Sequence, residues 1–296
     1  MSKILITGDS GFVGRHLTLL FSDDEWYGFD LNYDLDLRNY EQVRLAIDEF
    51  RPDYIYHLAA QAYIPESFAN PIRTFEVNTI GSINLLEAVR QVGIKPKILL
   101  AGTSEEYSDT EEEPITELSV PKPLSPYAVS KLAMDLMGQL YAQSYGMHIV
   151  TTRTFNHTGP GRGEMYAESS FAKQIAQIEL GQRDTLEHGN LESIRNYTDV
   201  RDIVRAYKLA IELPSGIYNI CSEVNVSIEK VLAMLKAHAS SPILTQQQDS
   251  LLRLNDFSFK RPSSKKFRDL TGWEPTIGFD KTLLDLLNYW RKQCSV

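Results

Sequence analysis

Residues 4–21 limit the fold more than any other stretch. Ile4–Thr7 is apolar enough for a buried strand, Gly8–Gly14 follows the pattern G-x-x-G-x-x-G, and Arg15–Phe21 has helical periodicity. Glycine adopts backbone angles that other residues avoid, and a helix N-terminus attracts phosphate. A strand, a glycine turn and a helix in this order indicate a site for a dinucleotide pyrophosphate, although three glycines between apolar runs also suit a purely structural turn.

Strands and helices keep alternating after this unit. We expect further strands at residues 26–29, 53–58 and 97–101, and one that starts near 148 and ends with residues 154–157. Helices are expected at 40–50 and 71–92. Such alternation is typical of a Rossmann-like α/β fold, a doubly wound parallel sheet that binds ligands at the carboxyl ends of its strands.

The strict alternation weakens after Gly163, which predicts a smaller, interleaved C-terminal lobe. We expect a dinucleotide-binding domain at residues 1–162, with returning segments near 196–222. Residues 163–195 and 223–296 would form the substrate-binding lobe.

Charge and cysteine content narrow the class of partner. The 296 residues carry a formal net charge of -9, which argues against non-specific binding to nucleic acid or anionic membranes and favours a small-molecule partner. Cys221 and Cys294 lie far apart, so neither a disulfide framework nor a metal site is expected. Without a signal-like N-terminus or a membrane-spanning run, we expect a soluble cytoplasmic protein.

The segment Ser125–Lys131 carries the strongest chemical pattern. Tyr127 and Lys131 are four residues apart and therefore share one face of a helix. An ammonium beside a phenol favours the phenolate, so the pair can act as a general acid and base. Taken alone, a packed tyrosine and a solvated lysine on an amphipathic helix explain the pattern as well.

Asp30 follows the expected second strand, about 20 residues past the glycine turn, where a carboxylate can bind the adenosine ribose. Because it would repel a 2′-phosphate, NAD is favoured over NADP. The alternatives are a solvent-exposed acid at a strand end, and rescue of a phosphate by the nearby Arg15.

Other strand ends are also polar: His57–Gln61, Gly102–Tyr107 and Thr154–His157. For His57 and His157 we prefer hydrogen-bonded structural roles.

With these motifs in this order, the whole chain resembles the extended short-chain dehydrogenase/reductase family, in its nucleotide-sugar-modifying branch. The resemblance implies that Tyr127 is the catalytic acid and base, that Lys131 lowers its pKa, and that Thr103 holds the sugar oxygen. It also implies a set of NAD(P)-binding residues: Gly8, Gly11, Phe12, Val13, Gly14, Asp30, Asp36, Leu37, Leu58, Ala59, Ala60, Asn78, Tyr127 and Lys131.

For the substrate, a nucleotide-diphospho-sugar, the resemblance implies contacts from Thr103, Ser104, Glu105, Asn156, Arg195, Arg253 and Asp256. The family pattern changes at residues 253–259, where a usual proline is missing. This change leaves both a GDP-linked and a dTDP-linked sugar open, with GDP favoured.

Within the family, residues 102–107, 153–161 and 189–195 are most similar to GDP-6-deoxy-4-keto-D-mannose reductases. The similarity implies NAD(P)H-dependent reduction at C4 of a 4-keto-6-deoxyhexose, for deoxysugar and polysaccharide biosynthesis, by a homodimer. Glu105 keeps open a GDP-mannose-type 4,6-dehydratase, in which a glutamate helps to remove water. A more distant alternative is a nucleotide-sugar sensor without catalysis.

Overall fold

The computed structural model describes residues 2–108, 113–251 and 261–295. Contacts divide the chain into two compact units. Unit 1 comprises residues 1–155, 204–220 and 263–273, and unit 2 comprises residues 156–203, 221–262 and 274–296. The predictions for Arg253 and Asp256 fall outside the described residues.

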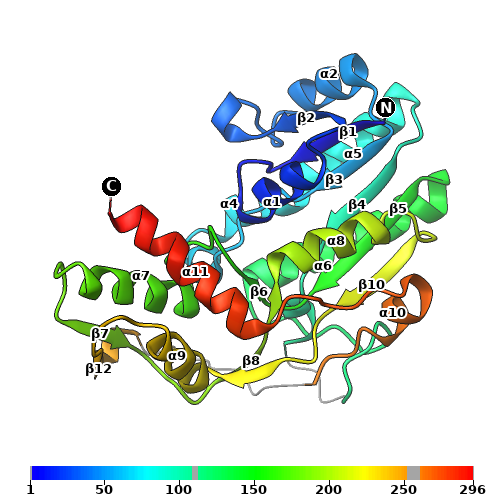
Figure 1. Ribbon diagram of the computed structural model, residues 1–296. Helices are drawn as coiled ribbons and strands as arrows, with labels where there is room; N and C mark the ends of the chain where they lie inside the picture. The colour runs from blue at the N-terminus through cyan, green and yellow to red at the C-terminus, as the bar shows by residue number, and fades with distance from the viewer. Residues whose placement is uncertain (1, 109–112, 252–260, 296) are drawn as a thin grey trace. The chain divides into compact units, whose positions relative to one another are not determined.

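Unit 1 contains a six-stranded parallel sheet in the order β10-β5-β4-β3-β1-β2 (Figure 1). Because all neighbouring strands run parallel, their carboxyl ends meet at one edge. The α/β prediction is confirmed. The strands are β1 (Lys3–Thr7), β2 (Glu25–Phe29), β3 (Tyr54–His57), β4 (Lys97–Ala101), β5 (His148–Thr154) and β10 (Gly216–Ile220).

Helices cover both faces of this sheet. On one face α2 (Tyr40–Phe50), α5 (Gly81–Val92) and α6 (Pro126–Tyr145) share an apolar core with alternate strand residues such as Ile55. The next residue, Tyr56, faces the other way and lies with its ring 5.2 Å from that of Phe21, directly after α1 (Phe12–Leu20). The ammonium of Lys208, in α8 (Val200–Ala210), also lies over the Phe21 ring.

The expected helix at 71–92 has three parts. A π-helical turn, η2 (Glu76–Ile80), separates α4 (Pro71–Phe75) from α5, and α3 (Ile64–Ala69) precedes them. The turn contains Asn78, and such turns are frequent at functional sites.

Three short elements complete unit 1: the 3-10 helices η1 (Leu31–Tyr33) and η3 (Ser104–Tyr107), and α10 (Lys265–Thr271). Although α10 is distant in sequence, it joins this unit because Lys266 donates to the carbonyl of Ile217 at 2.6 Å. The Phe267 ring packs near that of Tyr218.

Unit 2 has its own apolar core, formed mainly by α7 (Ala167–Glu179), α9 (Ile228–Ala237) and α11 (Phe279–Cys294). Short strands pair around it: β7 (Thr185–His188) with β12 (Leu244–Gln247), β8 (Ile194–Asn196) with β11 (Asn225–Ser227), and β6 (His157–Thr158) with β9 (Thr198–Asp199). The 3-10 helix η4 (Asp249–Leu251) follows β12.

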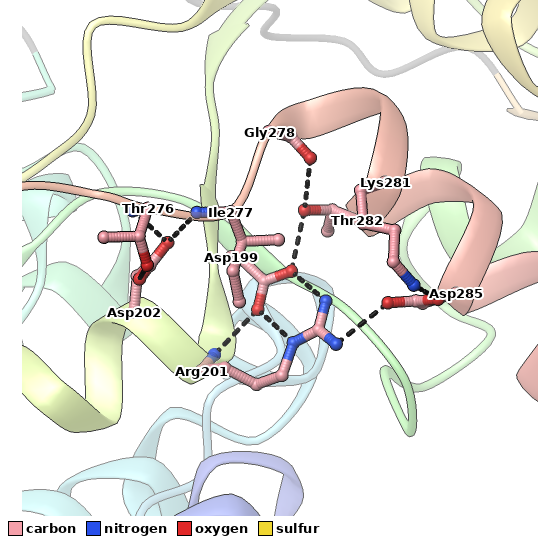
Figure 2. A network of polar contacts seen from close by, with 9 residues as sticks. All are labelled: Asp199, Arg201, Asp202, Thr276, Ile277, Gly278, Lys281, Thr282 and Asp285. Atoms are coloured by element: carbon pink, nitrogen blue, oxygen red, sulfur yellow. Dashed lines mark hydrogen bonds and ion pairs between the residues drawn. The ribbon is translucent and has the colours of Figure 1, made fainter.

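A polar network fastens the start of α8 to α11 within unit 2 (Figure 2). Arg201 pairs with Asp199 at 2.7 Å and with Asp285 at 2.8 Å, and Thr282 donates to Asp199 at 2.7 Å. Asp202 accepts from the backbone amides that precede α11, those of Thr276 and Ile277. The network therefore sets where α11 begins.

Among the helices that the structure describes, none is long and apolar enough to cross a bilayer. Residues 2–108, 113–251 and 261–295 contain no cluster of three or more His, Cys, Asp or Glu side chains that could hold a metal ion.

Candidate active site and dinucleotide site

The glycine turn is as tight as its pattern predicts. Gly8 has φ +74°, and a Cβ on it would lie 2.7 Å from the backbone of Ala59. A Cβ on Gly14 would lie 2.2 Å from the carbonyl oxygen of Gly8. Only glycine fits at both positions, so the backbone stays open where Phe12 and Val13 begin α1. This bare helix N-terminus fits a pyrophosphate group.

A buried relay links this turn to the next strand ends. Thr7 Oγ1 and His57 Nδ1 lie 2.7 Å apart, as do His57 Nε2 and Ser82 Oγ. Because Ser82 donates its own proton to the carbonyl of Asn78, Nε2 must be the protonated nitrogen and Nδ1 accepts from Thr7. Burial lowers the pKa of His57 to about 3, with a smaller effect from Lys131. His57 is thus neutral and hydrogen-bonded, which is the structural role expected from the sequence.

The relay positions residues predicted to line the dinucleotide. Thr7 Oγ1 accepts from the amide of Ala59 at 3.3 Å, and the amide of Leu58 donates to the carbonyl of Thr7. Ala60 follows, half buried, in the same segment. The position of Ala59 is therefore set by hydrogen bonds from the amides of Leu58 and Ala59 to Thr7, at the end of β1.

Asn78 is almost fully buried, and its side-chain amide is hydrogen-bonded to Gln61 and Ser130. Its amide donates to the carbonyl of Gln61 at 3.0 Å and to the hydroxyl of Ser130 at 2.9 Å, while its oxygen accepts from the amide of Gln61. Asn78 therefore ties the loop after β3 to helix α6, one residue before Lys131.

The proposed acid/base pair lies at the start of α6. Ser125 caps this helix by accepting from the amide of Ala128, and Pro126 occupies its first turn. Lys131 is buried, and its ammonium donates to the carbonyl of Ala101, the last residue of β4, at 2.8 Å. Burial lowers the pKa of Lys131 to about 8. Tyr127 is half buried one turn earlier.

Thr103 and Glu105 lie two and four residues beyond that carbonyl. Thr103 is buried, and its hydroxyl oxygen accepts from the amide of Glu105 at 3.2 Å, which leaves the hydroxyl proton to be donated elsewhere. Ser104 is half buried. The hydroxyl of Ser108 lies 2.6 Å from the carbonyl oxygen of Glu105 and 3.0 Å from its carboxylate, and it can donate its one proton to either.

Glu106 is a residue that the motif analysis missed. It is fully buried, and its carboxylate accepts from the amide of Thr103 at 3.3 Å, completing a capping box for η3. Its other oxygen pairs with Arg153 at 2.8 Å, and Arg153 also pairs with Asp135 at 2.6 Å. The spacing Thr103-x-x-Glu106 is a capping-box signal, so the sequence held the clue.

This buried cluster affects Lys131. Burial raises the pKa of Glu106, and the like charge of Asp135 raises it further, whereas the guanidinium of Arg153 lowers it. The negative charge of Glu106 in turn opposes the effect of burial on Lys131. The charge of the proposed catalytic lysine therefore depends on a carboxylate on another element.

The residues predicted to bind adenosine follow β2 in the chain. Asp30 caps η1 by accepting from the amide of Asn32 at 3.0 Å. The carboxylate of Asp36 is held by Arg38 at 2.6 Å, which lowers its pKa. Leu37 is buried against Gly81, where a Cβ would lie 2.9 Å from the Leu37 side chain.

Two predicted substrate residues belong to unit 2. The carbonyl of Asn156 accepts from the amide of Thr198 at 3.0 Å, and the guanidinium of Arg195 donates to the carbonyl of Ile194 at 2.8 Å. Both side chains are half buried.

Comparison with known proteins agrees with the motifs. The family model described as GDP-mannose 4,6 dehydratase matches residues 27–286. The chain belongs to this family. Its members fall within the extended short-chain dehydrogenase/reductases, so the predicted family and the prediction of an NAD(P)-dependent enzyme are confirmed.

One curated relative, GDP-6-deoxy-D-mannose reductase of Pseudomonas aeruginosa, is 32% identical over 98% of this chain and 98% of its own length. A solved structure of RMD from Pseudomonas aeruginosa complexed with NADPH covers 99% of this chain and 100% of its own, with a TM-score of 0.90 and 30% identity. The UDP-glucose 4-epimerase of Thermus thermophilus in complex with NAD covers 98% and 99%, with a TM-score of 0.87 and 30% identity. Both NAD and NADPH thus occur among similar structures.

Proposed function

We propose that this chain reduces the C4 keto group of a nucleotide-linked 4-keto-6-deoxyhexose, with GDP as the favoured nucleotide and NAD(P)H as reductant. The proposal is supported above all by Lys131, which lies one helical turn from Tyr127. Its buried ammonium donates to the last carbonyl of β4, that of Ala101, two residues before Thr103. The likeness to a reductase along nearly its whole length supports the direction of the reaction.

The chemistry divides among a few groups. The reduced nicotinamide supplies the hydride when it is bound. Tyr127 gives its phenolic proton to the C4 oxygen, so the carbonyl becomes an alcohol. The ammonium of Lys131 stabilises the phenolate that remains, and Thr103 donates its hydroxyl proton to the same oxygen to hold it in line.

We assign different residues to the dinucleotide and to the substrate. Gly8, Gly11 and Gly14 would hold the pyrophosphate, and Asp30 the adenosine ribose. Asn156 and Arg195 in unit 2 would contact the nucleotide sugar, together with Arg253 and Asp256, which lie outside the described residues.

A 4,6-dehydratase is the second candidate, because the family model carries that description and Glu105 is present. The reductase is favoured because the reductase relative matches over nearly the full length of both chains.

The deciding experiment follows NADH and NADPH absorbance with purified protein and GDP-linked or dTDP-linked 4-keto-6-deoxyhexose. Consumption of reduced cofactor with one sugar establishes the reductase and names the base. Water loss from a GDP- or dTDP-hexose, with no net consumption of cofactor, would establish the dehydratase. Binding of the sugar without turnover would indicate the sensor.

Tyr127→Phe tests the assigned acid. We expect the rate of turnover to fall by roughly 10²- to 10⁴-fold while cofactor binding persists, because only the proton donor is lost. Tyr145→Phe, on the last residue of the same helix, is the matched control and should leave turnover unchanged. Unchanged turnover in Tyr127→Phe would reject the assignment.

We also propose a homodimer in the cytoplasm. Val129, Leu136 and Leu140 are between 41% and 55% exposed and share one face of α6, and Phe68 and Ile72 are exposed on the neighbouring α3 and α4. Light scattering should give twice the monomer mass for the native chain, and Leu136→Lys should give the monomer mass. Cell fractionation tests the location.

A further inference from the structure

Asp9 lies inside the glycine turn and is 3% exposed. The hydroxyl of Tyr33 donates to its Oδ2 at 2.9 Å. Across from it stands Gly28 of β2, where a Cβ would lie 2.6 Å from the carboxyl carbon of Asp9. The carboxylate therefore fills the space that the glycine of β2 leaves open.

One oxygen of this carboxylate lacks a protein partner. Oδ1 of Asp9 is buried, and no donor within the described part of the chain reaches it. A buried acceptor without a donor is costly, so such atoms usually meet a ligand or water. This oxygen calls for a hydrogen-bond donor.

Asp30 lies close enough to Asp9 for its charge to raise the pKa of Asp9. The amide of Gly8 donates to the carbonyl of Phe29 at 3.0 Å, which joins the glycine turn to the residue before Asp30. Burial raises the pKa of Asp9, the hydrogen bond from Tyr33 lowers it, and the charge of Asp30 raises it again. Two carboxylates thus occupy the end of β2, where the ribose is expected.

We propose that Asp9, together with Asp30, is a specificity-determining residue that admits the adenosine ribose of NADH and rejects that of NADPH. The inference rests on the proposed function, whose dinucleotide site it refines. A ribose 2′-hydroxyl can donate a proton to an acceptor. An ionised 2′-phosphate has little to donate and is repelled by both carboxylates.

The proposed preference for NADH would distinguish this chain from the RMD of Pseudomonas aeruginosa, whose structure was solved with NADPH. A cation could offset the carboxylates, and exposed Arg15, one turn into α1, is the cation nearest in sequence to the glycine turn. Arg38 is already paired with Asp36 and Glu76. The experiment therefore includes Arg15.

Binding is measured directly on the full chain, without sugar, by fluorescence titration with NADH and NADPH. ADP-ribose and 2′-phospho-ADP-ribose, which lack nicotinamide, compete in a second series. We expect a preference on the order of 100-fold for NADH, and the same order for ADP-ribose. Asp9→Asn should tighten NADPH binding by roughly tenfold and leave NADH binding within about threefold.

Asp23→Asn is the matched control, because Asp23 is exposed beside the opposite end of β2 and its loss changes net charge equally. It should leave the preference unchanged. Equal binding of both cofactors by the native chain, or an equal shift in Asp9→Asn and Asp23→Asn, would overturn the inference. So would tight NADPH binding that Arg15→Ala abolishes. If neither cofactor binds, the proposed function itself fails.

Discussion

Each unit holds an arginine between two carboxylates, and the two clusters differ in how well their charges are satisfied. In unit 2, Asp199 accepts from the amide and the guanidinium of Arg201 and from the hydroxyl of Thr282 (Figure 2). In unit 1, Glu106 has one weaker amide bond and a share of Arg153. The first cluster is a structural fastening, whereas the second keeps a carboxylate whose pKa is raised.

Exposure adds to the difference. The Arg153 side chain is 3% exposed and that of Arg201 35% exposed. Water weakens the charge interactions of the partly exposed Arg201, whereas the ion pairs of the buried Arg153 are shielded from water. One arginine with two carboxylates therefore stabilises unit 2, whereas a similar trio in unit 1 affects the pKa of Lys131.

The largest effect is expected from Arg153→Met, which leaves Glu106 and Asp135 buried without their shared cation. We expect a loss of about 3–5 kcal/mol in the free energy of unfolding, measured by urea denaturation. Arg201→Met, the matched change in unit 2, should cost roughly 1–2 kcal/mol because Asp199 keeps Thr282 and a backbone amide. Equal losses in the two variants would remove the distinction between the clusters.

The buried polar groups of unit 1 also predict acid sensitivity. The pKa of His57 falls from 6.5 to about 3 on folding, so its contribution to stability is complete above pH 6.5 and is lost as pH falls toward 3. We expect roughly 3 kcal/mol to be lost from this source by pH 4. Urea denaturation across this range, with His57→Gln for comparison, should show a shallower pH dependence in the variant. An unchanged slope would argue that His57 titrates normally.

A smaller, functional effect is expected from Glu106→Gln. Removing the negative charge should lower the pKa of Lys131 further, so the alkaline decline of turnover should move to lower pH. The pH profile of kcat gives the measurement, and Asp285→Asn in unit 2 is the control. A profile that Glu106→Gln leaves in place would show that the two groups are not coupled in solution.

The smallest effect is expected for the stability of Asp285→Asn itself. Asp285 is 17% exposed and pairs with Arg201 and Lys281 near the surface. Its loss should cost less than about 1 kcal/mol in the free energy of unfolding. A larger loss in urea denaturation would mean that the network of Figure 2 behaves as one unit.

Local pattern was enough for most of the fold. The helix at 40–50 and the strand at 97–101 have the expected bounds, because apolar periodicity is a property of neighbouring residues. The strand that begins at His148 ends at Thr154, before the expected residues 155–157. The π-helical turn at Asn78 was missed, because apolar periodicity does not report which backbone hydrogen bonds a helix makes.

For the site, the sequence by itself determined which groups are available. Spacing indicated the glycine turn, Asp30, Tyr127 and Lys131, and the family resemblance indicated Thr103. Their roles stay predictions, tested by the variants above. Only the tertiary structure decided that Glu106 is buried beside Arg153 and that Asp9 fills the space beside Gly28. Burial and charge pairing arise between residues far apart in the chain, so spacing alone could not reveal them.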